Sequence, residues 1–109
     1  FTEADLVLDR RDGRVRVLYD CTNSQSICAA HDARVSPDGK RIAFTVARGD
    51  RLYSAKAFDT GPFLPAIGFK ATSYELWIYD TVTQQATLIE RNARMPDWPN
   101  NSSLVFASN

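Results

Sequence analysis

The segment of this 109-residue chain that most constrains its fold is residues 34–44, Arg-Val-Ser-Pro-Asp-Gly-Lys-Arg-Ile-Ala-Phe. Proline presets φ at about −65° for a tight turn, and glycine takes the positive φ that closes a hairpin. After the turn, Ile42, Phe44 and Val46 follow at a period of two, which places them on one face of a returning strand. The segment therefore predicts a β-hairpin, called the signature hairpin below, whose turn lies at residues 36–39.

The signature hairpin recurs, imperfectly, near the end of the chain. When the two stretches are laid on each other, Pro99 aligns with Pro37 and Phe106 aligns with Phe44. A recurrence of this kind indicates that one structural unit occurs more than once in the chain.

A second hairpin pattern recurs as well, with a slightly longer spacing. Two short apolar strands flank an Asp-Gly turn in residues 6–19, and in the later copy Leu76 aligns with Leu6 and Leu88 aligns with Leu18. Hairpin and signature hairpin thus alternate twice, and no segment keeps a helical periodicity for more than a turn. The sequence predicts an all-β chain built from four-stranded units.

Charge and composition exclude several classes of function. Thirteen Lys and Arg residues balance thirteen Asp and Glu residues, so there is no electrostatic reason to expect a nucleic acid or an anionic membrane as partner. An apolar content of 44% is enough for the core of one domain, and no apolar run approaches the roughly 18 residues of a membrane span. The chain starts at Phe1 without a methionine, which we interpret as a processed or excised piece.

The chain has two cysteines, Cys21 and Cys28, which enclose the polar run Thr-Asn-Ser-Gln-Ser-Ile. An even count in a polar loop predicts a small disulfide in an oxidising compartment, periplasmic or extracellular. The alternative is a pair of reduced loop thiols in the cytosol. With His31 as the only histidine, the pair falls short of the four ligands of a structural zinc site, and we expect no cofactor.

The repeats resemble those of TolB-like β-propellers, whose unit runs through Ser-Pro-Asp-Gly-Lys-x-Ile-x-Phe to a later Leu-Trp-hydrophobic-hydrophobic-Asp. Residues 33–47 carry the first part of that unit, and residues 75–90 carry the second. Residues 5–20 resemble the outer hairpin of a preceding blade, and residues 94–108 the inner hairpin of a following one. The resemblance implies an all-β propeller fragment with one complete four-stranded blade, residues 33–90, flanked by two half blades.

The last repeat departs from the family pattern, because Trp98 stands where serine is expected and Asn100-Asn101 replace Asp-Gly. Either this turn is of a different type or the alignment slips by one residue. More narrowly, residues 31–39 also resemble the propeller of hydrazine-synthase α-like proteins, which belong to multihaem assemblies.

Propellers close with about four to eight blades, so this chain does not close a ring alone. The resemblance implies that other blades complete it, from the same longer chain or from other subunits. The long segments 20–32 and 48–73 then share one face of the blade and are expected to meet a protein or ligand partner. The alternative is a compact sheet sandwich that folds by itself.

Three polar residues, His31, Asp32 and Arg34, fall where the chain enters the innermost strand of the expected blade. His31 is a candidate metal or haem ligand or channel contact; the alternative is a histidine hydrogen-bonded to Asp32. Asp32 and Arg34 either line the channel or form a mutual ion pair.

The inserted segment 48–73 is expected to break the strand at Arg48-Gly49-Asp50 and to form a long connection with apolar content. Its aromatic residues either build an apolar pocket or protein-binding patch, or pack onto the blade as a cover. They are Tyr53, Phe58, Phe63 and Phe69.

Catalytic motifs are absent from the sequence: there is no Gly-x-Ser-x-Gly elbow, no metal-spaced ligand set and no glycine-rich phosphate loop. We therefore expect a non-catalytic binding and assembly module. The alternative is the propeller portion of a larger extracytoplasmic enzyme, a hydrazine-synthase-like multihaem complex or a prolyl-oligopeptidase-type hydrolase.

Overall fold

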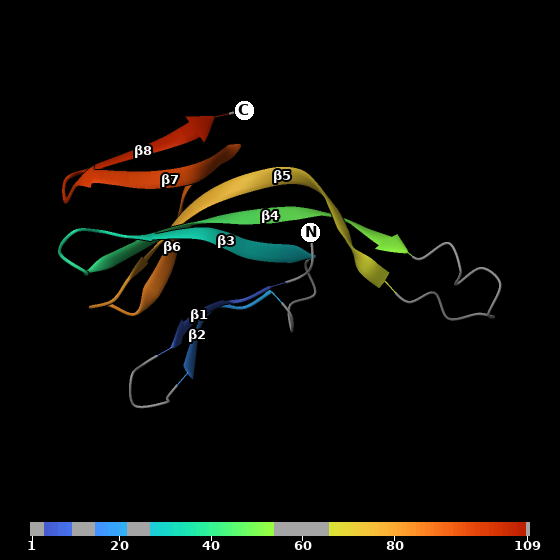
Figure 1. Cartoon of the computed structure of the whole chain (residues 1–109), viewed down its shortest axis with the longest axis horizontal. Coiled ribbons are helices and arrows are strands. Elements are labelled where there is room, and N and C mark those ends of the chain that lie inside the picture. The colour runs from blue at the N-terminus through green and yellow to red at the C-terminus, as the bar shows by residue number, and fades with distance from the viewer. Residues whose placement is uncertain (1–3, 10–14, 22–26, 54–65, 109) are drawn as a thin grey trace.

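The computed structural model describes residues 4–9, 15–21, 27–53 and 66–108, and all of its regular elements are β-strands (Figure 1). The all-β expectation is confirmed. Within these ranges no helix is long and apolar enough to cross a membrane. The strands are β1 (Leu6–Asp9), β2 (Val15–Tyr19), β3 (Cys28–Val35), β4 (Arg41–Tyr53), β5 (Ala66–Asp80), β6 (Gln85–Arg91), β7 (Ala93–Asn100) and β8 (Ser103–Ser108).

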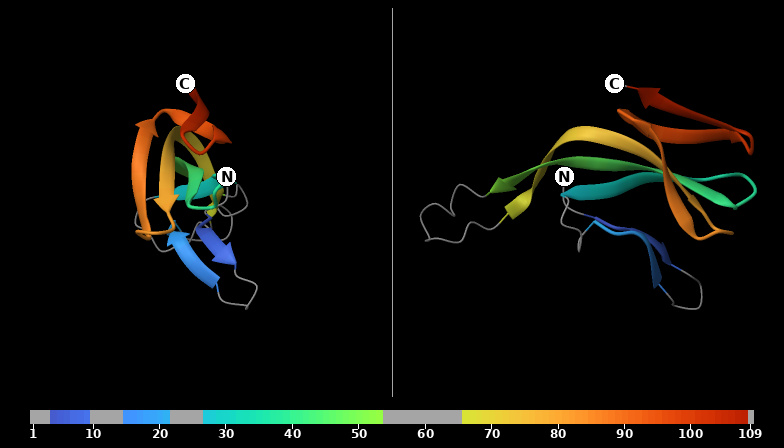
Figure 2. Two further views of the ribbon diagram at one scale, coloured as in Figure 1. Left: turned by 90° about the vertical axis from the view of Figure 1, so that its left-hand side faces the viewer. Right: turned by 180° about the vertical axis from the view of Figure 1, so that it is seen from behind.

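The strands form three antiparallel sheets (Figure 2). The central sheet has the order β3-β4-β5-β6, and it lies between the hairpin β1-β2 and the hairpin β7-β8. We call the side of the central sheet that packs against β1 and β2 the β1 face, and the opposite side, which packs against β7, the β7 face.

The β1 face carries the main core. Side chains at alternate positions of β4 point to it, and they pack against partly buried apolar residues of the hairpin β1-β2. The disulfide between Cys21 and Cys28 closes this core, with both residues at most 1% exposed, so the predicted bridge is confirmed. The buried members are Cys21, Cys28, Ala30, Ile42, Phe44, Val46 and Tyr79, and Tyr19 adds tilted ring contacts to Phe44 and Trp77.

The β7 face is held to the last hairpin by hydrogen bonds as well as by packing. The Met95 N–H donates to the Thr45 hydroxyl at 3.1 Å, and the Trp98 indole N–H donates to the Arg34 carbonyl at 2.9 Å. Trp98 is 8% exposed, and the guanidinium of Arg41 lies 4.7 Å from the centre of its ring. Trp98 is therefore a core residue of this interface.

The signature turn forms as predicted. Gly39 has a φ of +73°, and the Ser36 hydroxyl donates to the Asp38 carboxylate at 2.7 Å. The Lys40 N–H donates to the same carboxylate at 3.0 Å. These hydrogen bonds, from Ser36 first and then from Lys40, hold the pKa of Asp38 below its usual value.

Two expected loops are shorter than the sequence indicates. β3 already begins at Cys28, so His31 lies inside a strand. The expected break at residues 48–50 is wrong, because β4 continues to Tyr53 and pairs with the first half of β5. Gly49 permits this: the register shifts beside it, and a Cβ atom there would overlap the carbonyl group of Lys70. The chain elongates the hairpin where the sequence predicts a loop.

The two signature hairpins share one backbone irregularity in their first strands. β3 has a bulge between His31 and Arg34, and β7 has one between Arg94 and Asp97. A residue with positive φ sits at the same place in each, Asp32 at 52° and Met95 at 57°. The bulges therefore make Met95 the equivalent of Asp32, and Arg94 and Asp97 the equivalents of His31 and Arg34.

The two signature hairpins differ in the number of residues between their first and second strands. Arg34 pairs with Ala43, and its equivalent Asp97 pairs with Val105, so Val105 of β8 is the equivalent of Ala43 of β4. The second turn is consequently one residue shorter than the first. The alignment of the two turn prolines is therefore wrong by one residue along β7 as far as Asp97. β7 has a second register shift, between Asp97 and Asn100, that β3 lacks, so the pairing assigns no equivalent to Trp98 or Pro99.

The other two hairpins also share an irregularity. The register shifts between Leu6 and Val7 in β1, and at the equivalent place between Leu76 and Trp77 in β5. Val7 pairs with Val17 and Trp77 pairs with Leu88, so Leu88 of β6 is the equivalent of Val17 of β2. Leu18 is therefore equivalent to the next residue of β6, Ile89, and its expected alignment with Leu88 is wrong by one.

Candidate functional site

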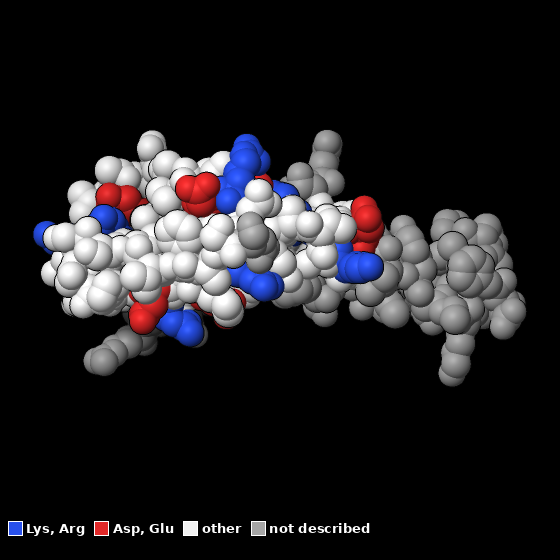
Figure 3. Space-filling view, turned by 90° about the horizontal axis from the view of Figure 1, so that it is seen from above, with Lys and Arg blue, Asp and Glu red and all other residues white. Residues whose placement is uncertain are grey.

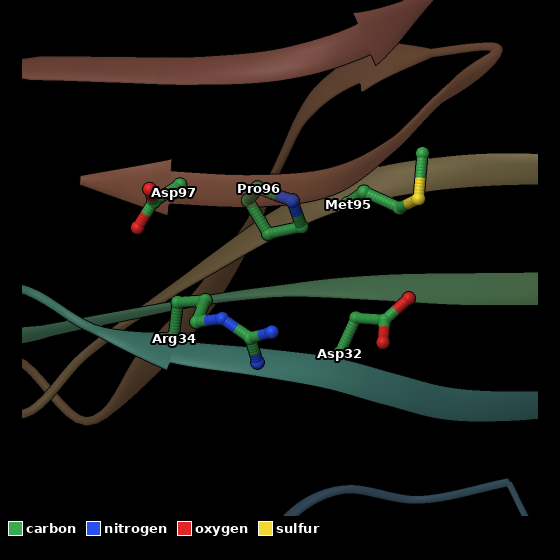
Figure 4. Close-up of a pocket in the computed structure, with 5 residues that line it drawn as sticks. All are labelled: Asp32, Arg34, Met95, Pro96 and Asp97. Carbon is green, nitrogen blue, oxygen red and sulfur yellow. The ribbon is translucent and has the colours of Figure 1, made fainter. Parts of the chain in front are cut away.

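A cleft of about 290 Å³ opens between β3 and β7, the first strands of the two signature hairpins (Figure 4). Three of the residues around it come from β7 and two from β3. They are Asp32, Arg34, Met95, Pro96 and Asp97.

The two bulges shape this cleft. His31 pairs with Thr45 and Arg34 pairs with Ala43, two residues away on β4, so His31 and Arg34 lie on the same face although three positions separate them. An extra residue in β3, with Asp32 in the left-handed region, makes this possible. Left-handed conformations of non-glycine residues are costly and tend to gather at binding sites, and two of the four in the described chain border the cleft, at Asp32 and Met95.

The charged groups of β3 are partnered differently from the expected ion pair. The Nδ1 atom of His31 is 3.0 Å from the Asp32 carboxylate, which confirms the hydrogen-bonded alternative for this histidine. Arg34 does not pair with Asp32. Its guanidinium donates to the Ala33 carbonyl at 2.9 Å and forms no ion pair within the described part of the chain, so the expected ion pair is wrong.

Two residues that the sequence did not single out, Tyr74 and Arg94, contact each other near the cleft, where Arg94 precedes Met95 in the chain. The guanidinium of Arg94 lies 4.8 Å from the ring centre of Tyr74, and the same ring meets His31 edge-on at 6.3 Å. Arg94 is the equivalent of His31 in the second signature hairpin. A sequence alignment that matches Arg94 to His31 also matches Asp97 to Arg34, and it would identify both residues as candidates. The alignment of the two turn prolines is shifted by one residue and does not match them.

The residues around the cleft carry charges of both signs. Arg34 presents a positive charge between the carboxylates of Asp32 and Asp97, while Met95 and Pro96 add an apolar edge. Among the described residues no three His, Cys, Asp or Glu side chains gather to hold a metal ion. A cleft with charges of both signs binds polar groups of both signs.

Of the four aromatic candidates, Phe69 alone has its side chain in the described part of the structure. Tyr53 ends β4 with its side chain outside the described part of the structure, and Phe58 and Phe63 fall outside it altogether. Phe69 is fully buried and packs with Ala29 and Ala47. Phe69 is therefore part of the core, and it belongs neither to the cleft nor to a surface patch.

A second polar cluster joins the first hairpin to the central sheet. Buried Glu75 accepts hydrogen bonds from Arg48 at 3.0 Å and from the Trp77 indole at 3.1 Å, and Arg48 donates to the Tyr19 hydroxyl at 2.6 Å. Burial disfavours the charged form of Arg48, but the hydrogen bond to Glu75 and the charges of Tyr19 and Glu75 outweigh it, so the pKa of Arg48 is raised. These contacts join β2 of the first hairpin to β4 and β5 of the central sheet.

The face seen in Figure 3 carries interspersed acidic and basic side chains without a large area of one sign. Comparisons with protein-family models, with characterised proteins and with solved structures find no match to this chain. The geometry of the site and of the repeats is therefore what supports a function.

Proposed function

We propose that this chain is a segment of a TolB-like β-propeller and acts as a non-catalytic module for binding and assembly. One observation carries the proposal: each kind of hairpin recurs with one register shift at an equivalent position. Short sequence motifs recur by chance, but equivalent breaks in strand register reflect equivalent structural units.

Apolar residues on the outer hairpins occupy positions that are covered in the central sheet. Val105 is 53% exposed, whereas its equivalent, Ala43, is fully buried beneath β7. Val7 and Val17 are 48% and 51% exposed. Their equivalents, Trp77 of β5 and Leu88 of β6, are half-buried on the β1 face. Exposed apolar surface at these positions marks contact faces for further units of the repeat, from the same longer polypeptide or from other chains.

The propeller arrangement suggests where the cleft lies and what it binds. In a propeller, β3 and β7 are the innermost strands of neighbouring blades, so the cleft between them faces the axis. Rigid strands hold its charged groups, and the partner that fits is a protein segment or ligand with polar groups of both signs. The disulfide favours a periplasmic or extracellular location.

Sedimentation velocity on the 109-residue chain tests the assembly role. We expect the wild-type chain to associate, and Val105→Lys to weaken association at least tenfold because it charges an outer contact face. The matched control is Val82→Lys, since Val82 is 73% exposed in the turn before β6 and belongs to neither outer hairpin. Equal effects of the two substitutions, or a wild-type chain that stays monomeric, would contradict the proposal.

A further inference from the structure

We propose that copies of this chain join head to tail through a shared four-stranded sheet, in which β1 of one copy pairs antiparallel with β8 of the next. The inference rests on the proposed function, because it takes the hairpins as units of one repeat. It adds a specific strand pair, a register and a partner, namely a second copy of this chain.

The two strands are edges of their sheets. β1 pairs with β2 alone and β8 with β7 alone in the described part of the chain. Their equivalents in the central sheet are β5 and β4, which are antiparallel neighbours. The hairpins β7-β8 and β1-β2 are therefore the two halves of the same four-stranded arrangement, and joining them in trans satisfies the edge groups that each leaves open.

The repeat fixes the register of the proposed pair. Phe44 pairs with Trp77 in the central sheet. Phe106 is the equivalent of Phe44, and Val7 is the equivalent of Trp77, so Phe106 lies opposite Val7 in the joined sheet. The next pair along the strand follows in the same way, Ala107 opposite Leu6.

Apolar exposure agrees with this register. Phe106 is 40% exposed and Val7 is 48% exposed, so the two residues that the register places opposite each other both have apolar surface to bury. Cross-strand apolar pairs of this kind stabilise antiparallel sheets.

An exposed apolar residue on the β7 face of the central sheet also supports the proposed pairing. Leu18 packs on the core of the β1 face, whereas its equivalent, Ile89, is 44% exposed. Ile89 is the extra residue at the register shift of β6, and its equivalent, Leu18, packs on the same side of its hairpin as Leu6. Leu6 is the equivalent of Leu76, which pairs with Thr45 on the β7 face, so Ile89 lies on the β7 face. A docked β1-β2 hairpin brings Val7 and Val17 onto this exposed position.

The proposed interface is heterologous, because β1 of one copy contacts β8 of the next. Repeating such a contact produces either a closed ring or an open chain of copies. Each copy contributes eight described strands, which make two four-stranded sheets once the edges are shared. Propellers of about four to eight blades then correspond to two, three or four copies.

Cysteine cross-linking tests the register. The Val7→Cys chain is mixed with the Phe106→Cys chain under mild oxidation, and the matched control mixes it with the Val105→Cys chain, whose cysteine is one residue away on the opposite face. The native disulfide is buried and does not compete. We expect at least tenfold more covalent dimer from the Phe106→Cys mixture, because directly opposed Cβ atoms come within disulfide reach.

Isotope-filtered NMR on mixed labelled and unlabelled wild-type chains provides a second measurement without a substitution. We expect contacts between the methyl groups of Val7 in one copy and the ring of Phe106 in the other. Association without these contacts and without excess cross-linking overturns the strand pairing while leaving the proposed function intact. A wild-type chain that stays monomeric overturns both.

Discussion

Replacing Gly49 with alanine tests whether β4 runs unbroken through the segment in which the sequence predicts a loop. In the structure, Gly49 lies opposite Ala71 in β5, next to a register shift. A Cβ atom there would meet the backbone of Lys70 and lie 3.0 Å from the Cα atom of Ala71. Backbone atoms cannot swing away as a flexible side chain can, so the two strands must separate locally.

The cost is similar by either of two routes. If β4 and β5 move apart at Gly49, about two ladder hydrogen bonds are lost, at about 0.5–1.5 kcal/mol each. If the hairpin instead opens beyond Gly49, Phe69 becomes exposed, and burying a phenylalanine is worth about 1.5–3 kcal/mol. Alanine also restricts the unfolded chain, which returns about 0.4–1 kcal/mol. The middle of these ranges gives an expected net loss of about 1.5 kcal/mol.

Urea unfolding followed by circular dichroism measures this loss, and Gly39→Ala is the matched control. Gly39 also has a structural demand, its φ of +73°, but a Cβ atom there meets nothing within 4 Å. Its substitution therefore carries conformational strain alone, about 1 kcal/mol. Hydrogen exchange at residues 50–53 should accelerate only in Gly49→Ala. If Gly49→Ala keeps wild-type stability and exchange, β4 does not pass Lys70 as described.

Two further predictions concern the signature hairpins. Trp98→Phe should lower the free energy of unfolding by about 1–2 kcal/mol in urea, because it removes the indole hydrogen bond to the Arg34 carbonyl; an unchanged value would contradict that bond. The lowered pKa of Asp38 means that its stabilising effect is complete above its ordinary pKa of 3.8 and disappears as the pH falls through the lower folded value. Thermal unfolding of Asp38→Asn should therefore differ from wild type at neutral pH and converge with it in acid, and a difference that is constant with pH would refute the assignment.

Local chemistry explains what the sequence could predict. Gly39 can adopt positive φ at low cost, and the hydroxyl and carboxylate of Ser36 and Asp38 stabilise the turn within a few residues. Cys21 and Cys28 lie close enough in the chain for a bridge. Such signals act over short distances, and the signature turn and the disulfide were both predicted from them.

The cleft depends on information that is not local. A bulge adds one residue to one strand relative to its partner. Aspartate tolerates a left-handed backbone better than most residues, but Met95, at the equivalent position, has no such preference, so the residue types do not mark the shared bulge. The shift of one residue between β7 and β8 concealed the equivalence of Arg94 to His31. Gly49 was interpreted as a strand breaker, but the close approach of Lys70 makes it a requirement of the longer hairpin.

Native mass spectrometry of the 109-residue chain most directly tests the claim that its hairpins are units that assemble. We expect complexes of two, three or four copies of the 12.2 kDa chain, with the disulfide intact in each. A chain that remains monomeric over a wide range of concentrations would contradict it, and the exposed apolar faces would then belong to a sandwich that folds alone.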